Sequence, residues 1–172
     1  MSASAPDRVL LVTGGSRGIG AAVARLAASR GYAVCVNYRS RQDAADAVVA
    51  AIVAAGGRGV AVSGDVGVEA DVLRVFEACD RALGPVTALV NNAGILETQM
   101  RVEAMDAARI TRILATNVVG SFLCAREAVR RMSTRHGGRG GQPDEVAQAV
   151  LWLLSDEAAF TTGSFVDVTG GR

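Results

Sequence analysis

A glycine-rich turn near the start of the chain has the residue types expected of a phosphate-binding loop. Glycine occurs at positions 14, 18 and 20, directly after the apolar run from Val9 to Thr13. Glycine lets a backbone approach a ligand closely because it has no Cβ. The helical pattern that follows directs free N–H groups and a positive dipole end at a pyrophosphate. We therefore predict a dinucleotide site here; the alternative is a tight turn that merely needs glycine.

Lysine and tyrosine, two residue types that can act together in proton transfer, are absent or few in this chain. It contains no lysine, since all 18 residues counted as Lys or Arg are arginine. Tyr32 and Tyr38 are its tyrosines, and four positions after them stand Val36 and Gln42. A tyrosine followed by a lysine on the next helical turn therefore cannot occur. A turn suited to a phosphate-bearing ligand is thus present without a tyrosine–lysine pair.

The composition bounds the class of protein. A chain of 172 residues, half of them apolar and with a net charge of +1, suits one globular domain with a real core. The balanced charge gives no reason to expect nucleic acid as a partner. No apolar run reaches the roughly 20 residues that span a bilayer, so we expect no membrane partner. Residues 1–7 lack a signal-peptide pattern and are expected to form a flexible tail.

The cysteines are dispersed along the chain. Cys35, Cys79 and Cys124 are far apart and lie in apolar segments, and His136 is the single histidine. Dispersed cysteines of this kind usually behave as small buried apolar residues. We therefore expect free thiols, a reducing cytoplasmic location and no metal site.

Strand-like and helix-like segments alternate along the sequence. Strands are predicted over 8–13, 32–37, 59–63 and 86–91, and helices over 18–30, 40–55, 68–83 and 106–132. Ser40 and Asp43 suggest a capping box for the second helix, and Gly84-Pro85 should end the third. After a loop at 135–141, a helix over 143–155 and a strand over 165–168 complete the chain. This alternation predicts an α/β fold with a doubly wound parallel sheet.

Two motifs carry a family resemblance. The Gly-x-x-x-Gly-x-Gly turn of Thr13 to Gly20, followed by Asn91-Asn92-Ala93-Gly94, resembles the short-chain dehydrogenase/reductase family. The resemblance implies a Rossmann-like sheet and a nicotinamide dinucleotide cofactor. The residues that it assigns to cofactor binding are Gly14, Ser16, Arg17, Gly18, Ile19, Gly20, Tyr38, Arg39, Ser40, Asp65, Val66, Asn91, Ala93 and Gly94.

The charge near the second strand bears on which dinucleotide is preferred. NAD-selective relatives usually place an acid at the end of this strand to bind the ribose hydroxyls. Here that position is Tyr38, Arg39 follows it, and Arg17 lies in the glycine-rich turn. Two guanidiniums without a nearby carboxylate suit a 2′-phosphate. We therefore favour NADP(H) over NAD(H); alternatively, Arg39 is a solvated loop residue.

Two further positions are given roles by the resemblance. Asp65 matches an aspartate that contacts the adenine edge, and it is also placed to cap the next helix. Asn117 matches the asparagine that holds a water in the family's proton relay, and it is the single catalytic candidate present. The alternative for Asn117 is a structural asparagine that kinks the long helix.

The resemblance extends from about residue 8 to residue 171, but an internal part is missing. Family members continue after the long helix with a fifth strand bearing a serine, a Tyr-x-x-x-Lys helix and a sixth strand. These elements are absent, so we expect one incomplete domain over 8–172 with a deletion junction near 135–143. The fourth strand should lose its neighbour, and the strand at 165–168 is predicted either to replace it or to leave the edge open.

The expected function follows from the resemblance and its gaps. An intact relative transfers hydride between NADP(H) and a carbonyl or alcohol substrate. Without the serine, tyrosine and lysine we expect an impaired oxidoreductase. The alternatives are a non-catalytic NADP(H)-binding module, a poorly folded deletion product, or a sequence that is itself incomplete. A homodimer through the last helix and strand is also expected.

Overall fold

The computed structural model describes residues 8–133, 152 and 158. The chain divides into two compact units, Met1–Ala128 and Val129–Arg172, and every strand described lies in the first. Several predictions fall outside the described residues: the tail at 1–7, the junction near 135–143, the helix at 143–155 and the strand at 165–168. The single domain over 8–172 and the dimer contact therefore stay predictions.

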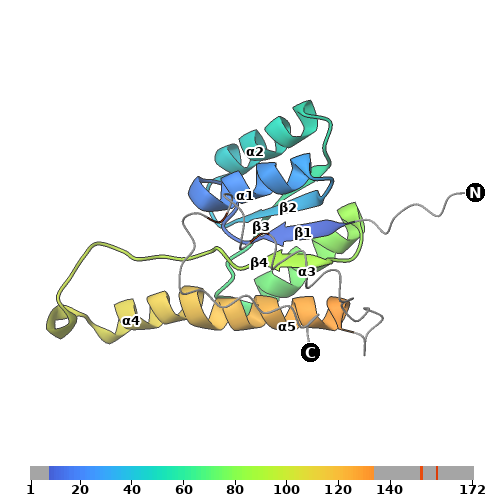
Figure 1. Ribbon diagram of the computed structural model, residues 1–172. Helices are drawn as coiled ribbons and strands as arrows, with labels where there is room; N and C mark the ends of the chain where they lie inside the picture. The colour runs from blue at the N-terminus through green and yellow to red at the C-terminus, as the bar shows by residue number, and fades with distance from the viewer. Residues whose placement is uncertain (1–7, 134–151, 153–157, 159–172) are drawn as a thin grey trace, which may run out of the picture. The chain divides into compact units, whose positions relative to one another are not determined.

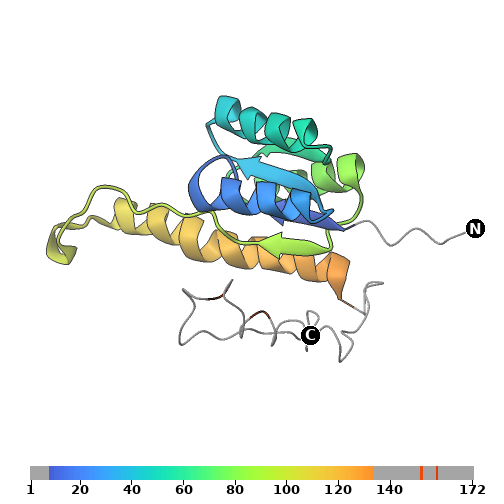
Figure 2. The ribbon, with the colours of Figure 1, turned by 45° about the horizontal axis from the view of Figure 1, so that its top comes forward.

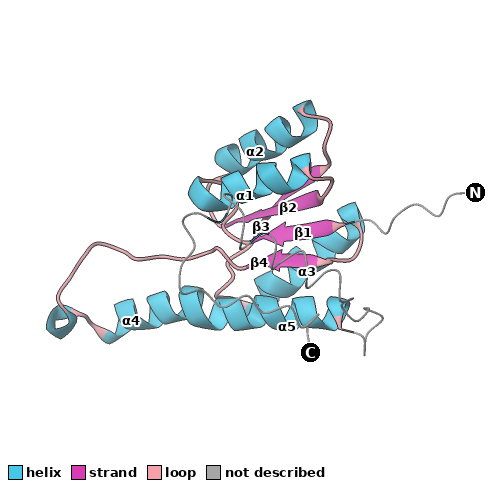
Figure 3. Ribbon diagram, in the orientation of Figure 1, coloured by secondary structure: helices cyan, strands magenta, loops and turns pink. Residues whose placement is uncertain are grey.

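The first unit is built on a parallel sheet (Figure 3). Its strands are β1 (Val9–Val12), β2 (Ala33–Tyr38), β3 (Gly59–Ser63) and β4 (Ala88–Val90), in the order β3-β2-β1-β4. In the register, Val12 stands opposite Val36 on one side and Val90 on the other. The predicted parallel α/β sheet is confirmed.

Helices cover both faces of this sheet, as a doubly wound fold requires (Figures 1 and 2). The helices α1 (Gly18–Ser29) and α2 (Gln42–Ala54) lie on one face. On the other face lie α3 (Glu69–Leu83) and a long helical segment. That segment comprises α4 (Ala107–Leu114), a π-helical turn η2 (Ala115–Val119) and α5 (Gly120–Met132), preceded by a 3-10 turn η1 (Val102–Ala104).

The core lies between the sheet and its helices. Every residue of β1 and β2 is buried, which explains their continuous apolar runs. Alanine-rich faces of α1 and α2 pack closely on these strands through Ala21, Ala24 and Ala45. Phe76 of α3 and Ile52 of α2 are almost wholly buried, and each contributes about 1.5–3 kcal/mol through removal from water. Cys35, Cys79 and Cys124 are buried free thiols, as predicted.

The start of α2 differs from the prediction. The helix begins at Gln42 with Arg41 as its N-cap, and no side chain caps it. The predicted capping box of Ser40 and Asp43 is therefore wrong. Asp43 falls in the first helical turn, where its carboxylate lies 3.4 Å from Arg41 Nε. The predicted end of α3 is confirmed, because Gly84 follows it with φ +104°.

Within the described residues β4 is the last strand of the sheet on its side. The strand predicted to pair there lies at 165–168, outside them. The same part of the chain has no helix long and apolar enough to cross a membrane. It also has no group of three or more Cys, His, Asp or Glu side chains placed to hold a metal ion.

Candidate functional site

The strand order creates a switch point beside β1. The chain leaves β1 toward β2 and β3 on one side, and then crosses over to β4 on the other. In open α/β sheets ligands bind in the crevice at the carboxyl ends of strands where the order reverses. Here the turn after β1 and the segment after β4 meet at that crevice.

The glycine-rich turn lies close against the segment after β4. A Cβ on Gly14, whose φ is +61°, would lie 2.9 Å from Ala93 Cα. A Cβ on Gly20 would lie 2.5 Å from Asn92 Nδ2. At the start of α1, Arg17 is the N-cap without a side-chain capping bond, and the first turn carries no acid. Close contact with Asn92 and Ala93 therefore leaves room only for glycine at positions 14 and 20. The N-terminus of α1 has no capping side chain, so its free N–H groups can bind an anion.

A hydrogen-bond network joins the two segments through Thr13 and Asn92. Thr13 Oγ1 accepts from the backbone N–H groups of Asn92 at 3.0 Å and Ala93 at 3.1 Å. Asn92 Nδ2 donates to the backbone oxygens of Thr13 and Gly14, both at 3.0 Å. Sequence reasoning missed both side chains in this role. The available signal was that each is a polar residue shortly after an apolar strand, Thr13 after β1 and Asn92 after β4.

Asn37 fixes the other side of the turn. This asparagine is 2% exposed in the otherwise apolar β2. Its Nδ2 donates to Gly64 O at 3.0 Å and to Val62 O at 3.3 Å, and its Oδ1 accepts from Gly14 N at 3.4 Å. A buried amide needs such partners. Sequence reasoning missed Asn37, although an asparagine inside a buried strand was itself a signal.

These segments surround a cleft of about 700 Å³. Most of the predicted cofactor residues line it, together with six that were not predicted. The predicted residues at the cleft are Gly14, Ser16, Arg17, Gly18, Ile19, Tyr38, Arg39, Ser40, Asp65, Val66, Ala93 and Gly94. The additional residues are Asn37, Arg41, Gly64, Asn92, Ile95 and Thr116.

Gly20 and Asn91 are not among the residues that line the cleft. Gly20 is buried against Asn92, so it allows the turn to pack closely on Asn92 without itself lining the cleft. The Asn91 side chain donates from Nδ2 to Ser121 O of α5 at 3.1 Å. Successive side chains of extended backbone point to opposite sides, so Asn92 faces the turn and Asn91 faces away. The Asn91 side chain therefore does not line this cleft, and its role in cofactor binding stays a prediction.

The expectation of guanidiniums without a nearby carboxylate is wrong for Arg39. Arg39 Nε lies 3.3 Å from Asp65 Oδ2. The physical reason is the parallel register, in which Tyr38 stands opposite Ser63, so the residues that follow the two strands meet. For Arg17, by contrast, the described residues show no ion pair.

Asp65 belongs to a turn and does not cap α3, whose N-cap is Val68. Its Oδ1 accepts from Gly67 N at 2.9 Å, and its own N–H donates to Asp71 Oδ2 at 2.9 Å. The Asp65 N–H, together with the Arg74 guanidinium 2.8 Å away, holds the pKa of the Asp71 carboxyl below its usual value. The Asp65 carboxylate is thereby oriented before any ligand arrives.

Asn117 lies in the π-helical turn and holds the cleft wall. Its Oδ1 accepts from Ile95 N and its Nδ2 donates to Ile95 O, both at 2.8 Å. Ile95 and Thr116 line the cleft on this side. π-Turns of this kind often occur at functional sites.

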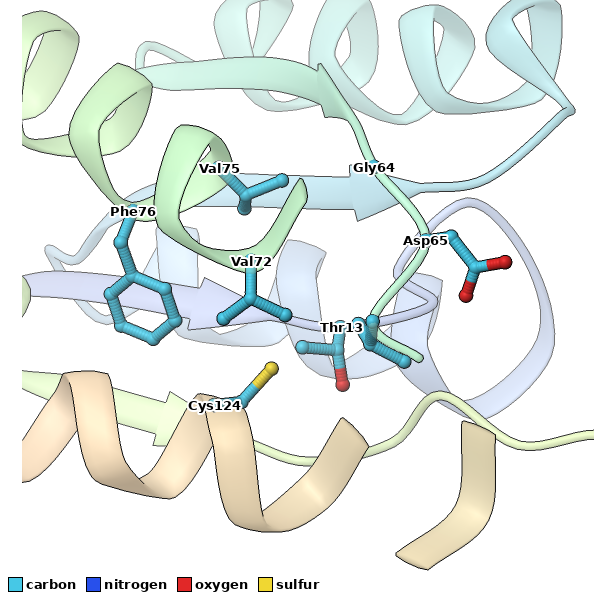
Figure 4. Close-up of a pocket in the computed structure, with 8 residues that line it drawn as sticks. Thr13, Gly64, Asp65, Val72, Val75, Phe76 and Cys124 are labelled. Atoms are coloured by element: carbon cyan, nitrogen blue, oxygen red, sulfur yellow. The ribbon is translucent and has the colours of Figure 1, made fainter. Parts of the chain in front are cut away.

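Beneath the cleft the residues are closely packed (Figure 4). Val72 and Phe76 of α3 face Cys124 of α5, while the Asp65 carboxylate points away from them. The space that these side chains line has no volume for a water molecule. This packed region adjoins the cleft at Gly64, Asp65 and Val66, which line both.

Comparison with known proteins decides the family. The sequence profile of the short chain dehydrogenases matches residues 8–139, which is most of the chain. This chain belongs to the short-chain dehydrogenase family. Members of the family bind a nicotinamide dinucleotide, and the parallel sheet and glycine-rich turn described above agree with that assignment.

Relatives within the family are similar in sequence and in structure. The chain is 36% identical to the uncharacterized oxidoreductase YgfF of Escherichia coli, over 95% of this chain and 99% of the relative. It resembles a short-chain dehydrogenase/reductase of Serratia marcescens with a TM-score of 0.71 and 32% identity, over 91% and 69% of the chains. A Burkholderia cenocepacia short chain dehydrogenase in complex with NADP gives a TM-score of 0.69 and 36% identity, over 73% and 50%.

The relatives are longer than this chain. The alignment with YgfF covers 245 positions, which 172 residues cannot fill, so the relative has internal residues without a counterpart here. Other curated relatives are matched over only 48% to 61% of their own length. This difference in length agrees with the internal gap inferred from the sequence.

Proposed function

We propose that this chain binds NADP(H) at the cleft and lacks the groups for efficient hydride transfer on its own. The observation that carries the proposal is the glycine-built turn after β1, which leaves the α1 N-terminus open at the switch point. The cleft volume of about 700 Å³ lies in the range of ligand sites.

The residues at the cleft fit the parts of a dinucleotide phosphate. The backbone from Ser16 to Ile19 and the Arg17 guanidinium would hold the pyrophosphate. Arg39, Ser40 and Arg41 would surround the 2′-phosphate, and Asp65 with Val66 would meet the adenine. Ala93 and Gly94, which also line the cleft, would face the nicotinamide ribose.

The chain's own residues limit the chemistry. When bound, NADP(H) supplies a hydride to a carbonyl or accepts one from an alcohol. Tyr32 precedes β2 at the end of the strand opposite the cleft, and Tyr38 is buried at the carboxyl end of the same strand, in a chain that contains no lysine. Both amide groups of Asn117 are bonded to Ile95, so we assign Asn117 to positioning the wall. A positioned general acid typically raises the reaction rate about 10²–10⁴-fold, and this chain lacks the tyrosine–lysine pair that would supply it.

Thermal unfolding with and without nucleotide tests the binding. NADPH at 100 times its Kd should add about 2.7 kcal/mol, a Tm increase of about 5–10 °C. Ile19→Glu places a carboxylate at the cleft end of α1, where the side chain is 78% exposed, and should abolish this increase. Leu26→Glu on the same helix, at a position outside the cleft lining, should preserve it. An equal response of the two variants would contradict binding at this cleft.

A second set of measurements tests the absence of turnover. NADPH oxidation with a broad panel of carbonyl compounds should stay at the uncatalysed rate. Turnover by the 172-residue chain would refute the impaired chemistry while leaving the binding site intact. A chain without cooperative unfolding would instead be a poorly folded product. An intact mass above that of 172 residues, in protein from the native gene, would show that the sequence is incomplete.

Two further expectations belong to this proposal. Light scattering on the purified chain checks the homodimer expected through residues 143–155 and 165–168. Fractionation of native cells checks the cytoplasmic location, which the three free buried thiols favour.

A further inference from the structure

Arg39 and Asp65 stand at the mouth of the cleft as an ion pair. They follow two neighbouring strands, β2 and β3, and both line the cleft. The two side chains differ in freedom. Arg39 is 64% exposed, whereas the Asp65 side chain is 27% exposed and bonded to its own turn through Gly67 N. Arg39 is therefore the partner that can exchange one anion for another.

The neighbouring arginines are arranged differently. Arg41 also lines the cleft, but its partner Asp43 is a solvent-facing carboxylate on α2 that does not line it. Within the described residues Arg17 forms no ion pair. Among these three cleft arginines, Arg39 is thus the one whose carboxylate partner shares the ligand's space.

We propose that Asp65 is a specificity-determining residue that competes with a nucleotide 2′-phosphate for Arg39. The proposal rests on the NADP(H)-binding function above. Arg39 Nε lies against Asp65 Oδ2, so a 2′-phosphate that binds Arg39 either displaces this carboxylate or shares the guanidinium with it, and the like charge of Asp65 repels the phosphate. Asp65 therefore lowers the preference for the phosphorylated nucleotide below the value that the arginines alone would set.

The effect is separable from any contact between Asp65 and the adenine. An adenine contact acts equally on nucleotides with and without the 2′-phosphate. The ratio of the affinities for 2′,5′-ADP and 5′-AMP isolates the 2′-phosphate, because the two compounds differ by that group alone. The same ratio for NADP⁺ and NAD⁺ extends the comparison to whole cofactors.

The experiment is a titration calorimetry cycle on the full chain. Asp65→Asn keeps an oxygen for Gly67 N and removes the charge, and it should raise the 2′,5′-ADP to 5′-AMP affinity ratio about three- to tenfold. Arg39→Gln should lower the ratio, and adding Asp65→Asn to it should change the ratio little. Asp46→Asn removes an equal charge from an exposed position on α2 and should leave the ratio unchanged.

Each outcome separates this inference from the function on which it rests. A ratio that is unchanged or lower in Asp65→Asn would overturn the competition, even with wild-type binding intact. An equal rise of the affinity ratio in Asp46→Asn would show that the effect comes from net charge alone, which would also overturn the competition at Arg39. If the wild-type chain binds neither nucleotide, the proposed function is contradicted, and the inference that rests on it falls with it. Should Asp65→Asn not fold by circular dichroism, Asp65→Ser, which also offers an oxygen to Gly67 N, replaces it in the cycle.

Discussion

The side-chain amide of Asn117 is bonded at both ends to the backbone of Ile95. It accepts from the N–H and donates to the carbonyl oxygen, each at 2.8 Å, and so copies the pairing of a strand neighbour. The π-helical turn places this side chain opposite the segment after β4. The cleft wall therefore depends on one asparagine in a helix.

Asn117→Ala should lower the free energy of unfolding by about 1–3 kcal/mol, because both Ile95 groups lose their partner. Asn117→Asp should cost at least as much, since a carboxylate oxygen would face the Ile95 carbonyl oxygen. Urea unfolding followed by circular dichroism gives the values. Asn91→Ala is the matched control; its amide donates once, to Ser121 O, and its loss should cost under about 1 kcal/mol. Equal losses of stability in the two alanine variants would contradict a stabilising role for the paired hydrogen bonds between Asn117 and Ile95.

Thr13→Val should lower both stability and nucleotide affinity. The substitution preserves shape and removes the acceptor for the Asn92 and Ala93 N–H groups, at a cost of about 2–4 kcal/mol. Thr87 gives the control, because its Oγ1 accepts from Val9 N at 2.9 Å and donates to Val9 O at the other end of β1. Thr87→Val should lower stability without weakening NADPH binding. Calorimetry at a temperature where both variants are folded separates the two effects.

Gly20→Ala and Gly18→Ala should differ in cost although a single residue separates the two positions. A Cβ at position 20 would lie 2.5 Å from Asn92 Nδ2 and 2.6 Å from Gly14 O, so about 3 kcal/mol is expected. A Cβ at position 18 meets nothing within 4 Å, and the φ of +54° alone should cost about 1 kcal/mol. Thermal unfolding of both variants provides the comparison. A larger cost at position 18 would show that the turn is not closed by Asn92.

Stability should fall as the pH rises above about 9. Burial, with a smaller effect from the nearby Glu127 carboxylate, raises the pKa of the Cys124 thiol from 9.0 to about 11. The folded chain therefore keeps a proton that the unfolded chain releases over this window, and stability falls by at most about 1.4 kcal/mol per pH unit for this thiol. Cys35 acts in the same direction, because the hydrogen bond between its thiol and that of Cys79, together with burial, raises the pKa of Cys35.

Urea unfolding from pH 8 to pH 10.5 measures this slope. Cys124→Ala should make it shallower, while its lower stability at pH 8 reports the lost packing against α3. A slope identical to that of the wild type would show that Cys124 does not carry the effect.

The sequence predicted the sheet and the turn well because each has a strong local signal. The apolar run of β1 followed by glycines identifies the turn, and alternating strands and helices identify the parallel sheet. The errors arise from partners distant in sequence. Asp65 meets Arg39 through the β2–β3 register, which no local pattern encodes. Asn91 and Asn92 are chemically alike, and only the direction of the backbone after β4 distinguishes their environments.

The position of β4 beside β1, away from β3, sets an order for folding. The strands β1, β2 and β3 can pair as soon as residue 63 has left the ribosome, since each joins its neighbour in sequence. The bond from Asn92 N to Thr13 Oγ1 closes a loop of 79 residues, so it must wait until that whole loop has been synthesised. During that interval the growing chain exposes one edge of β1, whose residues are all buried in the final fold, and this open edge is a template for pairing with another chain.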